Sequence, residues 1–116
     1  AGAAARVEFR QADACSLPAE FIDFDAVLIA NLLCRLPSPG ACLGRLEGMR
    51  GLLRSGGIVV IVSPYTWMEK FTPREVWLGG YYDDDGKPHF SQDGIKAMLG
   101  DEFQLLHRQD MPLLIR

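Results

Sequence analysis

The sequence predicts an α/β domain built on a parallel sheet. Residues 24–31 and 58–63 are two apolar stretches, and the second contains five consecutive aliphatic residues without polar alternation. Such runs are typical of strands buried on both faces of a parallel sheet. A helical pattern lies between them, so the three elements predict a β-α-β unit with a right-handed crossover.

The first predicted element is a strand over residues 6–11. Val7, Phe9 and Gln11 fall on one side of an extended chain, and charged residues fall on the other. This alternation indicates a half-exposed strand at the edge of a sheet. A polar turn follows over residues 12–18, where Pro18 prevents an immediate long helix.

The helix between the two apolar stretches is predicted to begin at Ser38, with Ser38 as N-cap and Pro39 at the first helical position. Gly56 is expected to end it, just before the second strand. Its apolar residues recur at helical spacing and predict the face that packs on the sheet: Leu43, Leu46, Met49, Leu52 and Leu53.

The C-terminal half is predicted to contain a long loop, a short helix and a hairpin. Residues 65–90 are irregular and rich in aromatics, Gly and Asp, which is typical of a functional or mobile loop. Ser91 is expected to cap a helix that closes at Gly100. Residues 103–107 and 111–115 read as two strands of an antiparallel hairpin.

Composition limits the classes of function. The chain has 116 residues, 48% of them hydrophobic, and a net charge of -3, which predicts one domain over residues 1–116 and no nucleic-acid partner. No apolar run approaches the roughly 20 residues that span a bilayer, so no membrane role is expected. The chain lacks an initiator Met and stops within an apolar run, and we expect a piece of a longer protein.

The three cysteines, Cys15, Cys34 and Cys42, form no C-x-x-C pair. Neither His lies near them in the sequence, so no metal site is predicted. Their odd number fits reduced thiols in a cytoplasmic protein, where they serve mostly as small buried hydrophobes.

The order of elements carries a resemblance to a known class. An edge strand ending in Ala12-Asp13-Ala14, a buried strand, a helix, a buried strand led by Gly-Gly and a final hairpin are similar to the C-terminal two-thirds of a class I S-adenosylmethionine-dependent methyltransferase. The resemblance implies a partial Rossmann-like sheet with strands 3 to 7 present and strands 1 and 2 missing.

A narrower resemblance rests on four segments, which are similar to the methyltransferase family of ovothiol biosynthesis. That family methylates a ring nitrogen of mercaptohistidine, and its members occur alone or fused to a sulfoxide synthase. The segments are Ala30-Asn31-Leu32-Leu33-Cys34-Arg35-Leu36-Pro37, Ser63-Pro64-Tyr65-Thr66-Trp67, Trp77-Leu78-Gly79-Gly80 and Pro112-Leu113-Leu114-Ile115-Arg116.

The class resemblance implies a place for the cofactor. Asp13 would accept a hydrogen bond from the adenine amino group, and the backbone N–H of Ala14 or Cys15 would meet a ring nitrogen. Asn31 and Leu32 would lie near the methionine portion and the reactive methyl. The alternatives are that Asp13 and Asn31 are turn residues and that Leu32 belongs to the core.

The narrower resemblance implies a small-molecule substrate site with aromatic walls. Arg35 would hold a carboxylate, with a solvated arginine as the alternative. Flat rings suit an imidazole, although the tryptophans could equally anchor the loop to the domain. A general base stays open, because Asp83, Asp84, Asp85 and His89 read more simply as a solvated turn. The other residues implied to bind substrate are Ser63, Tyr65, Trp67, Trp77 and Tyr81.

One departure from the class limits these expectations. No G-x-G-x-x-G string is present, and too few residues precede the edge strand for strands 1 and 2. The edge of the strand at residues 26–31 should then be unpaired, and an exposed apolar edge tends to pair with other chains. We expect a second copy, the N-terminal residues or another part of the protein to cover it, and no tight binding of S-adenosylmethionine by these residues alone.

Two other readings of the sequence stay open. The first is a non-catalytic module with the methyltransferase fold that assembles with a partner. The second is a nucleotide-dependent oxidoreductase with a related sheet, which the C-terminal hairpin and the Ala-Asp-Ala turn disfavour. A fold likeness alone does not decide between functions.

Overall fold

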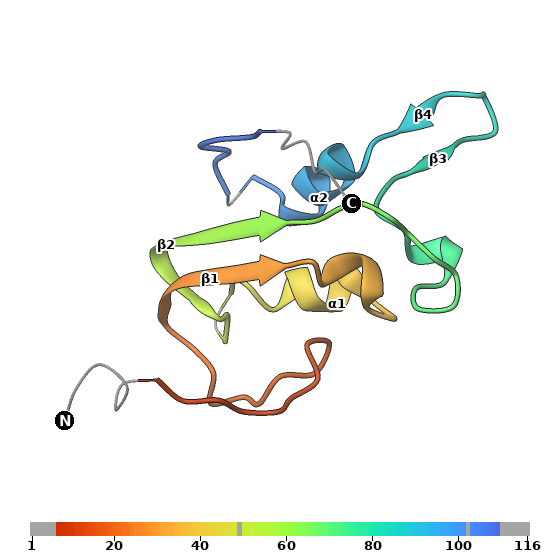
Figure 1. The fold of residues 1–116 in the computed structure, drawn as a ribbon. Helices are drawn as coiled ribbons and strands as arrows, with labels where there is room; N and C mark the ends of the chain where they lie inside the picture. Colours follow the sequence, from red (N-terminus) through yellow and green to blue (C-terminus); the bar gives the residue numbers. More distant parts are fainter. Residues whose placement is uncertain (1–6, 49, 102, 110–116) are drawn as a thin grey trace, which may run out of the picture.

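The computed structural model of the chain describes residues 7–48, 50–101 and 103–109, which form a small α/β unit (Figure 1). Two strands form a parallel sheet and two shorter strands form an antiparallel pair. In order, the elements are β1 (Phe24–Ala30), the 3-10 helix η2 (Leu33–Arg35), α1 (Pro39–Gly44), β2 (Leu53–Val62), the 3-10 helix η3 (Arg74–Val76), β3 (Tyr81–Tyr82), β4 (Pro88–His89) and α2 (Ser91–Leu99).

The predicted β-α-β unit is confirmed. β1 and β2 lie side by side and run in the same direction (Figure 1), with Val27 opposite Val59 and Ile29 opposite Ile61. β2 begins at Leu53, before the apolar run, and the pairing is irregular there, with a shift of register. Phe24 lies opposite Leu53 but Ala26 lies opposite Ile58, so β2 has extra residues between these two pairs. Gly56 was expected to end the helix. It lies inside β2 with φ +79°, where the shift requires a residue that tolerates a left-handed backbone.

α1 begins as predicted but is much shorter. Ser38 Oγ accepts a hydrogen bond from the Ala41 N–H at 3.3 Å, which confirms the cap. The prediction of a helix reaching residue 54 is wrong, since α1 ends at Gly44. Glycines at positions 40, 44 and 48 lower the helix propensity of this stretch, and Gly48 takes φ +96°. Leu46 still reaches the core, but from a turn.

The sheet is covered on one face only, so the prediction of strands buried on both faces is wrong. Ile29 is 4% exposed and packs in the same core as Leu43 of α1 and Ile95 of α2. The opposite face carries Leu28 and Val60, which are directly paired across the strands and are 68% and 49% exposed. Two strands with both helices on the same side leave this apolar face open.

The predicted outer strands are not formed. Residues 7–11 and 103–107 have no strand pairing, and residues 111–115 lie outside the described residues. The antiparallel pair is instead β3–β4, inside the segment predicted as an irregular loop, with Tyr81 opposite His89. Because a strand needs a neighbour, the alternating pattern of residues 7–11 alone does not suffice.

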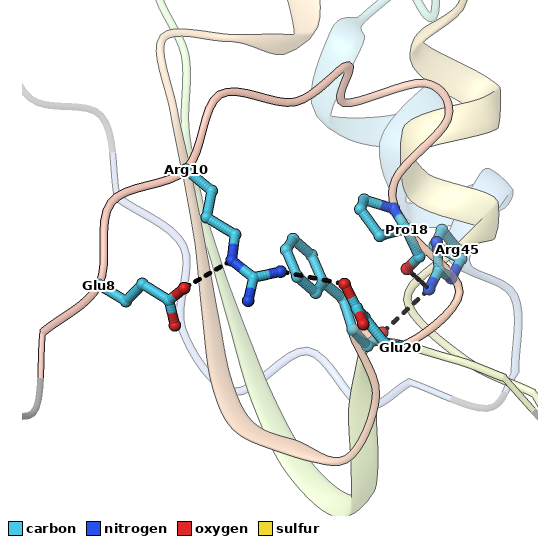
Figure 2. Close-up of polar contacts among 6 residues, drawn as sticks. Glu8, Arg10, Pro18, Glu20 and Arg45 are labelled. Atoms are coloured by element: carbon cyan, nitrogen blue, oxygen red, sulfur yellow. Dashed lines mark hydrogen bonds and ion pairs between the residues drawn. The ribbon is translucent and has the colours of Figure 1, made fainter.

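Arginine side chains hold the N-terminal segment in place of strand pairing (Figure 2). The Arg45 guanidinium donates to the backbone carbonyls of Leu17, Pro18 and Phe21 at 2.9, 2.8 and 3.0 Å. Figure 2 shows Arg45 beside Pro18. Arg10 lies between two glutamates, with distances of 2.7 Å to Glu8 and 3.0 Å to Glu20. The sequence pattern gave no signal for this role of Arg45.

Among the described residues, no helix has both the length and the apolar character needed to cross a membrane.

Candidate functional site

The candidate site begins where the two parallel strands end. β1 finishes at Ala30 and β2 at Val62, and the Asn31 N–H donates to the Val62 carbonyl at 2.7 Å. The side chains that follow both strands therefore emerge at the same edge of the sheet. In open α/β sheets this edge is where ligands bind.

Two residues at this edge have left-handed backbones. Asn31 has φ +54° and Tyr65 has φ +55°, the latter directly after Pro64. Asn adopts this region with little penalty, whereas a bulky Tyr does so only where its surroundings impose it. Ser63 Oγ accepts a hydrogen bond from the Tyr65 N–H at 3.1 Å and helps to hold this conformation. Asp23, just before β1, is a third such residue at the opposite end of the sheet.

Arg35 joins the end of η2 to the segment after β2. Its guanidinium donates to the Thr66 carbonyl at 2.9 Å and to Thr66 Oγ1 at 3.3 Å, and it lies 5.3 Å from the centre of the Phe71 ring. These contacts make Arg35 a clamp between two loops. They leave fewer of its five donors for the carboxylate that the resemblance assigns to it.

Cys34 lies beneath this clamp and is fully buried. Its Sγ accepts from the Arg35 guanidinium at 3.3 Å and lies 3.9 Å from Ser63 Oγ. The structure therefore brings Ser63, Arg35 and Cys34 together at the strand ends. Sequence reasoning treated Cys34 as a buried hydrophobe, and its contact with Ser63 had no signal in the spacing.

The two tryptophans anchor the 65–90 segment. Trp67 is 9% exposed and its Nε1 donates to Ser91 Oγ at 2.8 Å. Trp77 stacks on Trp67 with ring centres 6.4 Å apart, and its Nε1 donates to the Thr72 carbonyl at 2.8 Å. The hydroxyl of Ser91, expected to cap α2, is used by Trp67 instead, and Phe90 is the N-cap residue.

Trp77 also lines an open hollow of about 440 Å³. Tyr81 forms part of its wall and stacks on His89, with ring centres 4.8 Å apart. His89 Nε2 lies 2.9 Å from Asp83 Oδ2, and this contact is the main cause that lowers the pKa of the Asp83 carboxyl. The hollow is lined by Arg74, Glu75, Trp77, Tyr81, Tyr82, Asp83 and Asp84.

The Asp13–Cys15 segment forms a turn apart from these residues. Asp13 Oδ1 accepts from the Cys15 N–H at 2.9 Å, and the Asp13 carbonyl accepts from the Ser16 N–H at 3.0 Å. The resemblance assigns the Asp13 carboxylate and the Cys15 N–H to the adenine. In this structure the two groups are hydrogen-bonded to each other. Ala14 and Cys15 are half-buried, and both pack against the core.

Leu32 is half-buried and packs against the core, as its alternative reading predicted. Within the ranges that the structure describes, no three His, Cys, Asp or Glu side chains gather closely enough to hold a metal ion. A scan against protein-family profiles matches none, and a search of curated proteins gives no significant match.

Proposed function

We propose that the chain is the substrate-side part of an S-adenosylmethionine-dependent methyltransferase that acts on a small thiol-imidazole amino acid such as mercaptohistidine. The observation that carries the proposal is the pair of left-handed residues, Asn31 and Tyr65, at adjacent carboxyl ends of two parallel strands. Left-handed residues other than glycine, above all a bulky one such as Tyr65, cluster at binding and catalytic sites, and this sheet edge is the usual place for ligands.

The described residues do not fit the whole cofactor. Asp13 and the Cys15 N–H are bonded to each other, and the sequence has no Gly-rich turn for a methionine or ribose group. The proposed role of the described residues is therefore to bind the methyl acceptor, the thiol-imidazole amino acid. Tyr65 and Tyr81 supply aromatic rings with hydroxyls that suit an imidazole, and Trp77 lines the hollow beside Tyr81.

The proposal is tested with the purified chain and, where its gene reads further upstream, with the longer product. Each is supplied with methyl-labelled S-adenosylmethionine and either mercaptohistidine or plain histidine. We expect transfer to mercaptohistidine by the longer product and no tight cofactor binding by the 116-residue chain in calorimetry. Absence of transfer to either acceptor by the longer product rules out the proposed activity.

Asp13 is tested in the same longer product. Replacement of Asp13 by Ala should weaken cofactor binding by about 1–3 kcal/mol if the carboxylate accepts a buried hydrogen bond from the adenine. Asp101→Ala, at an exposed turn after α2, is the matched control and should bind normally. Equal affinity of the two variants would leave Asp13 with its turn role only.

One observation favours a second function, that of a non-catalytic module that assembles with a partner. The open face of the sheet exposes Leu28, Ile58 and Val60, with exposed fractions of 68%, 51% and 49%. Apolar faces of this kind mark contact surfaces. A longer product that binds no cofactor but elutes as a complex would favour the module.

A further inference from the structure

Two cysteines that are distant in the sequence converge on one carbonyl group. The Cys15 thiol donates to the Ser38 carbonyl at 3.3 Å, and the backbone N–H of Cys42 donates to the same oxygen at 3.4 Å. Cys15 belongs to the turn before β1, whereas Cys42 lies in α1. Because both contacts go to a single oxygen, the Cys15 thiol and the Cys42 backbone are close neighbours.

The two thiols differ in their exposure to solvent. Cys15 is half-buried at the surface of the core, whereas Cys42 is 5% exposed within it. Burial, together with a smaller contribution from negative charge on Cys15, raises the pKa of the Cys42 thiol to about 11. Cys15 is the more accessible of the two thiols, so it meets an external oxidant first.

We propose that Cys15 and Cys42 form a redox-sensitive pair, which a small disulfide such as oxidised glutathione converts into an intramolecular disulfide bond. This inference does not depend on the methyltransferase proposal. It rests on the shared Ser38 carbonyl and on the difference in burial between the two sulfurs.

The reaction has two exchange steps. The Cys15 thiolate attacks one sulfur of the oxidant, breaks its S–S bond and releases one glutathione thiolate. The Cys42 thiolate then attacks Cys15 Sγ in the mixed disulfide and releases the second glutathione. The protein loses two electrons and two protons, and both are recovered in two molecules of reduced glutathione. The second step is slow at neutral pH, because Cys42 is protonated there.

Cys34 is not a member of the pair. It is fully buried, and its sulfur accepts a hydrogen bond from Arg35 and contacts Ser63 at the strand ends. A bond between Cys15 and Cys42 would fasten the turn at residues 12–18 to α1. Closing this loop restricts the unfolded chain and should raise the melting temperature by on the order of 10 °C.

The test is disulfide mapping of the folded chain after treatment with oxidised glutathione at mildly alkaline pH. Cleavage after Arg and Glu separates the three cysteines, because Glu20 lies between Cys15 and Cys34, and Arg35 lies between Cys34 and Cys42. We expect one linked peptide pair containing Cys15 and Cys42, and a higher melting temperature that a reductant reverses. The same treatment in urea should give mixed pairings.

Three variants complete the test. Cys34→Ser should keep the bond, Cys15→Ser should abolish it, and Cys42→Ala should stop at a stable glutathione adduct on Cys15. If Cys42→Ala does not fold, the mapping of the unmodified chain still decides. The proposal is overturned if the folded chain stops at the Cys15 adduct, or if Cys34 takes part in the linked pair.

Discussion

At the scale of single residues, Asp83 organises the β3–β4 turn. Its Oδ1 accepts from the N–H groups of Asp85 and Lys87 at 3.0 and 2.9 Å, while its Oδ2 faces His89. The sequence predicted a turn for the Asp-Asp-Asp-Gly run, and the hydrogen bond from the Gly86 N–H to the Asp83 carbonyl confirms it. Which of the three aspartates accepts these bonds depends on the register of the hairpin, so spacing alone did not identify it.

The lowered pKa of Asp83 predicts a pH dependence of the turn. A carboxyl whose pKa is lower in the folded than in the unfolded state stabilises the folded state. This stabilisation is complete at a pH above the unfolded pKa of about 4, and it is lost as the pH falls through the folded-state pKa. His89→Gln should move the Asp83 pKa back toward its usual range. Carboxyl titration by NMR measures the shift. An unchanged Asp83 pKa in the variant would contradict the assignment.

Arg45 provides a second prediction at the residue scale. Arg45→Lys keeps the charge but cannot span three carbonyls, so we expect a loss of about 1.5–3 kcal/mol of stability. The segment at residues 17–21 should open first, and limited proteolysis after Glu20 should accelerate. Arg50→Lys, at an exposed position, is the control. Equal cleavage rates in the two variants would show that Arg45 does not hold the segment.

At the scale of elements, the apolar stretches and the Ser-Pro start were sufficient to predict β1, β2 and the beginning of α1. The length of α1 was not predictable from apolar spacing, because Leu46 and Leu52 reach the core from a turn: the Leu52 N–H donates to the Arg45 carbonyl at 2.8 Å. The same side-chain pattern is thus compatible with a helix and with a closed turn. The glycines at positions 40, 44, 48 and 51 lower the helix propensity of this stretch and favour the turn.

The surroundings of one glycine in α2 and one in α1 predict opposite effects for their substitution by Ala. A Cβ at Gly94 would clash with the Leu78 carbonyl oxygen, whereas a Cβ at Gly44 would meet nothing within 4 Å. Gly94→Ala should therefore destabilise the chain by about 1–3 kcal/mol, although Ala is the better helix former. Gly44→Ala, its control, should stabilise by about 0.5–1 kcal/mol. Chemical denaturation measures both, and stabilisation by Gly94→Ala would show that the loop does not press on α2.

At the scale of the whole molecule, the chain exposes more surface than a compact protein of its mass. Its accessible surface is 9075 Å², compared with about 6300 Å² for a compact 12.9 kDa monomer. The sequence predicted that the outer edge of the strand at residues 26–31 is unpaired. In the described residues β1 pairs with β2 alone, so its other edge has no strand beside it. The open sheet face was not predicted. An uninterrupted apolar run indicates that a strand can be buried on both faces, but it does not show whether a helix covers each of them.

Register partners allow the open face to be tested by paired substitutions. Leu28→Lys with Val60→Glu places opposite charges side by side on the open face and leaves the net charge unchanged. We expect this variant to stay folded and to self-associate less, as measured by sedimentation. Val27→Lys with Val59→Glu, the matched pair on the covered face, should unfold the chain. Unfolding of both variants would show that the first face is covered too.

The stacked indoles of Trp67 and Trp77 make the molecule its own optical probe. The sequence has two tryptophans, and both lie in this single contact, so the entire indole signal arises where the 65–90 segment meets α2. Release of this segment would change the emission and abolish the coupling between the two rings. Docking of the loop can then be followed in time without any added label.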